Sequence, residues 1–430
     1  MRAGLGRTVA QALTVALALT AALAQPPASA AGATITFACG ASANDQEYCI
    51  KHAQVWAKAT GNTVKTISVS QNPVETLSLF RQLFAAKSPD VDVIMMDVVW
   101  PGIIQKHLLD LKPYSSGAER EHFPAMVENM TVGDRLVGMP WYTDAGLLYY
   151  RKDLLHQYGR PVPKTWEELI ETAELIQRAE RAAGRIVHGY VFQGRAYEGL
   201  TCNALEWVAS YSGGSIVRTD GQVDVRNSGV IQSLRMARHL VTRVSPPGVL
   251  NYNEEDTRGV FQNGNAVFMR NWPYAWGLMS KGDSAVSGRV GVAPLPAGGA
   301  QGRPAATLGG WSLGVSKYSR FPREAADLVL YMTSAEIQKK RAIQAAFNPT
   351  RPALYSDPEI ERTHPFMIQL REVFASAVAR PSTVTATRYP RVSQQFWDAV
   401  HASISGRTTP EDATRRLEGQ LNLVKRQEWR

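Results

Sequence analysis

The alternation of strand-like and helix-like segments at the start of the chain constrains the fold more than any other feature. Short β-branched or apolar runs lie at Thr34–Ala38, Val64–Val69 and Val91–Met96, and helical patterns over Glu47–Ala59 and Val74–Ala86 separate them. The third run is nearly continuously apolar, which is typical of a strand that is buried on both faces. The order strand, helix, strand, helix, strand favours parallel strands joined by helical crossovers. The sequence therefore predicts an α/β fold with a largely parallel sheet flanked by helices.

A second α/β unit is expected after Gly138-Met139-Pro140, which interrupts the first pattern. Thr165 and Glu168 form a capping box, in which each side chain can accept a backbone N–H at the start of a helix. About 400 residues exceed what one hydrophobic core usually supports, so two domains are expected. The other expected elements are strands at Val187–Phe192, Ala266–Arg270, Val290–Ala293 and Ser312–Val315, and helices at Arg323–Met332 and after Thr409-Pro410.

The N-terminus has the pattern of a secretory signal peptide. Arg2 and Arg7 precede an apolar stretch from Val9 to Ala24, and the small residues Ala28-Ser29-Ala30 form a cleavage pattern. Residues 1–30 are therefore expected to be removed on export to a periplasm. No cysteine stands at the cleavage site, so no lipid anchor is expected. No later run approaches the roughly 20 apolar residues that cross a bilayer.

Charge and cysteine content narrow the function classes. The formal net charge is +9, but lysine and arginine are scattered and no nucleic-acid-binding motif is present, so nucleic acid is not expected as a partner. Cys39 ends a predicted strand and Cys49 lies in the first turns of the next helix, so the two can meet in a disulfide, with Cys202 then free and buried; the sequence leaves open whether the bridge forms. No Cys/His ligand spacing or phosphate-binding glycine motif occurs, so neither metal nor cofactor is expected.

The segment Asn271–Trp276 places three aromatic rings in six residues around Pro273. Proline stiffens the backbone, and rings on a stiff segment form flat apolar surfaces whose polar tips can still bond. Such surfaces suit nucleobases, other rings or the apolar face of a sugar, although the rings could also fill a core. Trp272 and Tyr274 are the candidates for ligand contact, and Trp276 is the candidate core anchor.

Acidic residues follow the predicted strands. Asp97 ends the buried run, Asp144 follows Tyr142, and Asn44-Asp45 follows the first strand. In open α/β sheets, ligands bind outside the carboxyl ends of the strands. The acids could be the two carboxylates of a glycosidase, or acceptors for sugar hydroxyls, or simply helix caps and ion-pair partners.

Four further positions are candidates for the same site. Gly310-Trp311-Ser312-Leu313-Gly314 matches the nucleophile elbow of hydrolases, but a strand and not a helix is expected after the serine, so hydrolase chemistry is not expected. We interpret Gly310 as allowing close backbone approach to a ligand and Trp311 as another ring surface. Arg351 stands between two prolines and could direct its donors at a ligand, or form a surface ion pair. Tyr197 lies in a glycine-bounded loop.

Taken together, these segments resemble the periplasmic sugar-binding proteins of ATP-binding-cassette (ABC) importers, most closely the trehalose/maltose-binding proteins. The resemblance spans the mature chain and rests on Phe37–Tyr48, Asp97–Trp100, Tyr142–Leu155, Tyr197–Leu200, Asn271–Trp276, Gly291–Pro296, Thr307–Trp311 and Asn348–Arg351. It implies a monomeric, non-enzymatic, two-lobed protein that closes over a disaccharide and delivers it to the membrane permease subunits. One lobe would comprise residues 31–141 and 294–337, and the other residues 142–293 and 338–430.

The resemblance also implies which positions bind the ligand. They are Asp45, Asp97, Tyr142, Asp144, Trp272, Tyr274, Gly310, Trp311 and Arg351. Asp45 stands where the related proteins have a longer glutamate, and Phe347 stands where a tryptophan is expected. Both departures affect the choice between disaccharides. A different sugar, a glycerol-phosphate-type ligand, or a secreted glycosidase using Asp97 and Asp144 are the alternatives.

Overall fold

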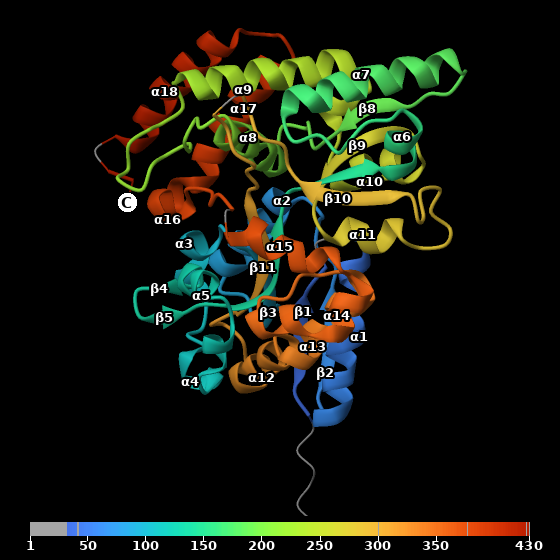
Figure 1. The fold of residues 1–430 in the computed structure, drawn as a ribbon. Coiled ribbons are helices and arrows are strands. Elements are labelled where there is room, and N and C mark those ends of the chain that lie inside the picture. The colour runs from blue at the N-terminus through green and yellow to red at the C-terminus, as the bar shows by residue number, and fades with distance from the viewer. Residues whose placement is uncertain (1–31, 41–42, 300, 376, 427, 430) are drawn as a thin grey trace, which may run out of the picture.

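The computed structural model describes residues 32–40, 43–299, 301–375, 377–426 and 428–429. The predicted signal peptide, residues 1–30, lies outside this part of the chain. Two lobes, each built on its own β-sheet, lie one above the other in Figure 1. The two-lobed α/β architecture that the sequence predicts is therefore confirmed.

The first lobe contains a five-stranded sheet in the order β2-β1-β3-β11-β6. Strand β1 is parallel to β2 and β3, whereas β11 is antiparallel to β3 and β6. The elements from the start of this lobe are β1 Thr34–Ala38, α1 Ala43–Thr60, β2 Thr63–Ile67, α2 Pro73–Ala85, β3 Val93–Asp97, α3 Pro101–Ile104, α4 Lys112–Ser115, α5 Pro124–Asn129, β4 Thr131–Val132, β5 Arg135–Leu136 and β6 Met139–Ala145.

The second lobe contains a four-stranded sheet in the order β10-β7-β9-β8. Only the β8–β9 pair is parallel; β7 is antiparallel to β9 and β10. Its elements are β7 Leu147–Arg151, α6 Lys152–Gln157, α7 Trp166–Ala182, β8 His188–Val191, α8 Glu198–Ser210, α9 Ser228–His239, α10 Glu254–Gln262, β9 Ala266–Asn271, α11 Tyr274–Met279 and β10 Val290–Pro294. Both sheets are thus mixed, and the expectation of mostly parallel sheets is corrected.

The remaining elements return to both lobes. They are β11 Leu308–Val315, α12 Pro322–Met332, α13 Ala335–Ala345, α14 Pro358–Thr363, α15 Phe366–Ala375, α16 Ser382–Thr385, α17 Tyr389–Ile404 and α18 Pro410–Lys425. Figure 1 shows α12, α13 and α14 in the first lobe and α17 and α18 in the second, near α9. The expected boundaries placed residues 338–430 together in the second lobe; α13 packs on α1 and α12 of the first lobe and also on α11 of the second, so these boundaries stay a prediction.

The local sequence explains several of these elements. Strand β3 is buried along its whole length, as its continuous apolar run predicts. Thr165 and Glu168 form the predicted capping box, and α7 begins at the next residue, Trp166. The segment after Gly138 was expected to break the pattern, but Met139–Ala145 forms a fully buried strand, because Pro140 occupies a position that the irregular β6–β11 pairing tolerates.

Within the described residues, three segments connect the two lobes. The first crossing is Gly146, between β6 and β7; the second is the segment 295–307, between β10 and β11. The third includes residues 377–381, which run beside the second, since Leu308 N–H donates to Val378 O (3.0 Å) and Val378 N–H to Ala306 O (2.7 Å). A disulfide joins Cys39, which follows β1, to Cys49 in α1, and Cys202 is free and buried. The structure thus contains the disulfide that the sequence left open.

Candidate functional site

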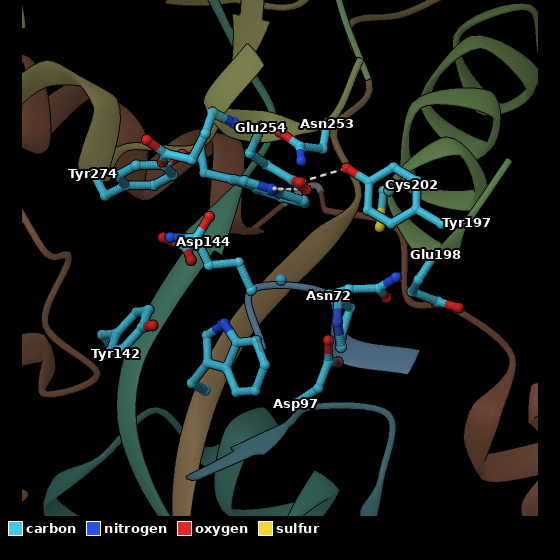
Figure 2. A pocket seen from close by; sticks show the side chains of 18 of the residues that line it. Asn72, Asp97, Tyr142, Asp144, Tyr197, Glu198, Cys202, Asn253, Glu254 and Tyr274 are labelled. Atoms are coloured by element: carbon cyan, nitrogen blue, oxygen red, sulfur yellow. Dashed lines mark hydrogen bonds between the residues drawn. The ribbon is translucent and has the colours of Figure 1, made fainter. Parts of the chain in front are cut away.

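A pocket lies between the lobes, close to the crossings. About 870 Å³ of space, part of it open to solvent, is not filled by protein atoms there. Figure 2 shows Asp97 and Asn72 facing Glu254, Asn253 and Tyr197 across it. The described residues that line it are Gln71, Asn72, Pro73, Asp97, Tyr142, Asp144, Arg195, Tyr197, Glu198, Gly199, Cys202, Asn253, Glu254, Glu255, Trp272, Tyr274, Gly309, Gly310, Trp311, Phe347 and Arg380. The structure therefore brings together eight of the predicted site residues: Asp97, Tyr142, Asp144, Tyr197, Trp272, Tyr274, Gly310 and Trp311.

The second lobe contributes the rings of the Asn271–Trp276 segment. Trp272 directly follows β9, and the hydroxyl of Tyr149 donates to its carbonyl oxygen at 2.8 Å. Tyr274 begins α11, and its hydroxyl donates to Glu255 at 2.7 Å. Both rings line the pocket, and these bonds fix their positions. Trp276 instead packs against the ring of Phe366, with centroids 4.7 Å apart, as predicted for a core anchor.

The first lobe contributes Tyr142 and Trp311, which are paired in register on β6 and β11. The Trp311 ring meets Trp100 edge-on, with centroids 5.5 Å apart and planes at 87°. Gly310 has φ +117°, and a Cβ there would lie 2.6 Å from the carbonyl oxygen of Tyr142. Only glycine fits this conformation and this contact, so the approach of β11 to β6 beneath the ligand space depends on it.

Asp144, on β6, is a pocket carboxylate with an unused hydrogen-bond acceptor atom. Its residue is 6% exposed, and its Oδ1 atom has no hydrogen-bond partner in the described structure. Burial, reinforced by the charge of Asp45, raises the Asp144 pKa to about 7, although Arg270 and Arg341 oppose this shift. A buried acceptor without a partner is unfavourable unless a ligand supplies a donor. Asp144 is thus placed to accept a hydrogen bond from a ligand.

Asp97 is joined to the second lobe through Arg380. The Arg380 guanidinium donates to Asp97 Oδ1 at 2.9 Å and to Glu198 Oε1 at 2.8 Å. Asp97 ends β3, Glu198 begins α8 and Arg380 lies in the third crossing, so this bridge spans the pocket floor. Burial raises the pKa of Asp97, and the charge of Arg380 opposes that rise. Sequence reasoning missed Arg380 as a site residue; its only local signal is the proline that follows.

The acidic start of α10 was also missed. Glu254 accepts hydrogen bonds from the Tyr197 hydroxyl and from Trp272 Nε1 (3.3 Å), and Figure 2 shows the first of these contacts. Asn253 caps α10 by accepting from the N–H groups of Glu255 and Asp256. In sequence, this segment looks like an ordinary helix N-cap: Asn253-Glu254-Glu255-Asp256. Nothing in that pattern indicates that the segment lies beside the pocket.

Three predicted site residues are not among those that line the pocket. Asp45 lies behind it, fully buried, and accepts from Arg341 Nη2 (2.6 Å) and the Tyr142 hydroxyl (3.1 Å). Arg351 donates to Thr333 O at 3.0 Å and forms an ion pair with Glu121. The backbone of Asn44 lies in the first turn of α1, and its side chain lies outside the described part of the structure. Asp45 and Arg351 are thus engaged by other groups of the chain in this structure, and their role in ligand binding stays a prediction.

Two buried guanidinium groups support the rings from behind. In the second lobe, Arg270 Cζ lies 3.8 Å from the Trp272 ring centroid. In the first, Arg341 Cζ lies 4.0 Å from the Trp141 centroid and 5.3 Å from that of Tyr142. Each distance is within the range of a cation–π contact. Each lobe therefore presents aromatic surfaces to the pocket and places a cation away from it.

No hydrolytic or metal chemistry emerges from the geometry. Ser312 lies within β11, so the sharp strand-to-helix turn that a nucleophile elbow requires is not formed there. Among the described residues, no group of three or more His, Cys, Asp or Glu side chains is arranged to hold a metal ion. In the same part of the chain, no helix has both the length and the apolar character that a bilayer crossing requires.

The fold is that of a two-lobed binding protein: it has two lobes, three connecting segments and a pocket between the lobes. Residues 41–339 match the family model of bacterial extracellular solute-binding proteins. A relative from Deinococcus radiodurans, named "Probable ABC transporter-binding protein", is 50% identical over 398 residues, which cover 92% of this chain and 94% of the relative. The chain therefore belongs to the bacterial extracellular solute-binding protein family, whose members are not enzymes.

Solved structures agree with this assignment. Maltose-bound T. maritima MalE3 superposes with a TM-score of 0.87 at 41% identity, covering 91% of this chain and all of that one. The GacH receptor of Streptomyces glaucescens superposes with a TM-score of 0.82 at 21% identity, covering 92% and 99% of the two chains, and shows the fold alone. Together, the family, the relative and the MalE3 structure support a role as the substrate-binding component of an ABC sugar importer.

Proposed function

We propose that this protein captures a disaccharide of the maltose or trehalose type in the pocket between its lobes and delivers it to the permease of an ABC importer. The observation that carries the proposal is the placement of aromatic rings from both lobes around Asp144, whose Oδ1 atom has no hydrogen-bond partner among the described residues. Rings can cover the apolar faces of a pyranose, and carboxylates accept hydrogen bonds from its hydroxyls. Nothing in this arrangement requires a bond to be made or broken.

The similarity to a maltose-bound protein at 41% identity supports the choice of ligand class. Structures of more distant neighbours contain other ligands, among them acarbose, ribitol and mannitol, at 21–24% identity. A micromolar dissociation constant corresponds to about −8 kcal/mol. A few charge-assisted hydrogen bonds at roughly 1.5–3 kcal/mol each, together with ring contacts, are sufficient for this after ordering costs.

Ligand capture would close the lobes about the three crossings. A ligand that contacts both lobes favours the closed arrangement by its additional contacts there. We assign residues 32–145 and 308–363 to the first lobe and residues 147–294 and 382–426 to the second. The strands of each range form one sheet, α12 packs on β11 of the first sheet, and α17 packs on α8 and α9 of the second lobe. We further propose that the protein acts as a monomer in the periplasm after removal of residues 1–30.

The charge of the pocket argues against two alternatives. Its lining contains five carboxylate residues and two arginines, which disfavours a glycerol-phosphate-type anion. A glycosidase would need Asp97 and Asp144 as its two reacting carboxylates. Asp97 is bound to Arg380, and the family is not enzymatic, so this alternative has no support in the site.

A ligand screen tests the proposal directly. We expect maltose or trehalose to raise the melting temperature of the purified mature protein, and sn-glycero-3-phosphocholine and DNA to leave it unchanged. Titration calorimetry should then give the dissociation constant. Absence of a shift with every disaccharide in a panel of maltose, trehalose, sucrose and palatinose, combined with a shift by DNA, would contradict the proposal.

A matched pair of tryptophan variants tests the site. Trp272→Ala removes a ring that lines the pocket, and we expect the disaccharide affinity to fall about 10- to 100-fold. Trp276→Ala removes a ring that packs on Phe366, so it should lower the melting temperature and leave the affinity unchanged. Equal affinities for Trp272→Ala and the wild type would mean that Trp272 is only a packing residue.

A further inference from the structure

The back of the Trp272 ring is occupied by a buried cation. The Arg270 Cζ atom lies 3.8 Å from the ring centroid, and Arg270 is fully buried. Trp272 is partly buried and lines the pocket. A guanidinium in this position attracts the aromatic face and restricts the ring. The orientation of the Trp272 surface therefore depends on where Arg270 is held.

Arg270 is held by a buried ion pair with Glu206 of α8. Its Nε donates to Glu206 Oε2 at 2.9 Å, its Nη2 contacts the other carboxylate oxygen, and both side chains are 1% exposed. Gln193 completes the arrangement: it accepts from Arg270 Nη1 at 3.1 Å and its amide donates to the Arg270 carbonyl at 3.0 Å. A bidentate contact of this kind fixes the plane of the guanidinium.

Stability alone does not account for such a pair. Removing two charges from water is unfavourable, and replacement of a buried ion pair by apolar residues is often neutral or stabilising. The neighbours of the ion pair therefore indicate what it does. On one side it touches the Trp272 ring; on the other it touches the chain segments that join the lobes.

The first and second crossings both contact this ion pair. The N–H of Thr307, at the end of the second crossing, donates to Glu206 Oε1 at 3.2 Å, and the Thr307 hydroxyl donates to Cys202 O at 2.9 Å. At the first crossing, a Cβ on Gly146 would lie 2.0 Å from Glu206 Oε1 and 2.7 Å from Arg270 Nη2. The absence of a side chain at Gly146 is what allows the crossing to pass against the pair.

We propose that Arg270 and Glu206 are positioning residues that fix the Trp272 ring relative to the two crossings between the lobes. The proposal rests on the proposed function, because the ring they orient is the one expected to contact a sugar. When the crossings bend, the ion pair carries Trp272 with them, so the ring surface is in place when the lobes meet around the ligand. Affinity then depends on two side chains that need not touch the sugar.

The test removes both charges together. The double variant Arg270→Met/Glu206→Leu removes both charges of the ion pair, so neither is left buried without the other, and Asp144 keeps Arg341 as a compensating charge; the variant should therefore fold. The matched control is Arg151→Met/Asp153→Leu: Arg151 also forms a bidentate pair, at 2.7 and 2.6 Å, but neither residue lines the pocket. We expect the first variant to bind maltose about tenfold more weakly and the control to bind like the wild type.

A ligand-free measurement separates this proposal from the proposed function. The indole N–H resonance of Trp272, assigned with Trp272→Phe, should shift or broaden in Arg270→Met/Glu206→Leu and stay unchanged in the control. Gly146→Ala gives a second variant, in which the pair is displaced from the crossing side; the same resonance should move. If the wild type binds no sugar, the proposed function fails and this resonance still decides the positioning role. Wild-type resonance in both variants, or wild-type affinity in the double variant, would overturn the inference.

Discussion

The substitution Asp144→Asn should weaken ligand binding and, at pH 8, increase the free energy of unfolding. The carboxylate is 6% exposed, has an oxygen without a partner, and is affected by charges on every side: Asp45 and Asp97 raise its pKa, and Arg270 and Arg341 lower it. Burial dominates, so the pKa is raised to about 7. Asparagine retains the shape and removes the titration.

The effect on binding follows from the ionised fraction. A sugar hydroxyl donates more strongly to a carboxylate than to a neutral acid. If only the ionised form binds, a pKa of about 7 leaves roughly 3% of Asp144 competent at pH 5.5 and roughly 97% at pH 8.5. The apparent dissociation constant of the wild type should therefore decrease about 30-fold between these pH values. In Asp144→Asn the affinity should be lower at pH 8.5 and nearly independent of pH.

The effect on stability has the opposite sign. The folded-state pKa lies above the ordinary value of 3.8, so between about pH 4 and pH 7 the folded protein retains a proton at Asp144 that the unfolded chain has lost. The free energy of unfolding therefore decreases as the pH rises through this window. About three pKa units at 1.36 kcal/mol each amount to about 4 kcal/mol. A buried amide that lacks one partner costs about 1–3 kcal/mol, so Asp144→Asn should be more stable than the wild type by about 1–3 kcal/mol at pH 8.

Urea unfolding of the ligand-free proteins at pH 4.5 and pH 8 measures the stability difference, and calorimetric titration with maltose from pH 5.5 to pH 8.5 measures the affinities. Asp144→Asn should gain stability relative to the wild type only at the higher pH. The reasoning is refuted if the wild-type affinity is flat across this pH range and Asp144→Asn shows no gain at pH 8. If the wild-type affinity does not change with pH and Asp144→Asn is clearly more stable at pH 8, then Asp144 destabilises the folded protein and does not contact the ligand.

Three further outcomes follow from individual contacts. Arg380→Met should weaken maltose binding at least tenfold, whereas Arg351→Met should leave the calorimetric dissociation constant unchanged, because only the first guanidinium lines the pocket. Gly310→Ala should lower the melting temperature sharply or prevent soluble expression, since its Cβ would meet a backbone oxygen of β6 at 2.6 Å; a wild-type melting curve would contradict this. Reduction of Cys39–Cys49 should lower the free energy of unfolding by about 3 kcal/mol in urea titrations with and without dithiothreitol, and coincident curves would show that the bridge adds nothing.

Local sequence patterns were sufficient for the elements but not for their pairing. The continuous apolar run before Asp97 predicts β3, and the Thr165 capping box predicts the start of α7, because both signals arise within a few residues. The direction of β11 depends on a return from the second lobe, so no local signal could show that it enters the first sheet antiparallel. The same holds for Met139–Ala145, where Pro140 suggests a break until its partner strand is known.

The candidate site shows the same division. Rings beside a proline and an acid after a buried strand are recognisable, and Trp272, Tyr274 and Asp97 line the pocket. Arg351 was chosen as the cation because prolines flank it, but its guanidinium is bound to Thr333 and Glu121. Arg380 is the guanidinium that lines the pocket together with Asp97, and the third crossing brings these two residues together although they are nearly 300 positions apart. Sequence spacing contains no information on such a contact.

The distribution of charge in the site explains how a basic protein can favour a neutral ligand. The chain has a formal net charge of +9, yet the pocket lining has five carboxylate residues and two arginines. Arg270 and Arg341 lie behind the rings and lower the pKa of Asp144, but neither lines the pocket. They therefore reduce the cost of a buried carboxylate without offering donors to the ligand. Under the proposed function, the ligand would meet carboxylates that the protein already supplies with donors, together with the Oδ1 atom of Asp144, to which a sugar hydroxyl can donate and a phosphate cannot. If the proposed function holds, ligand selection would follow from the local arrangement of these charges and not from the net charge of the chain.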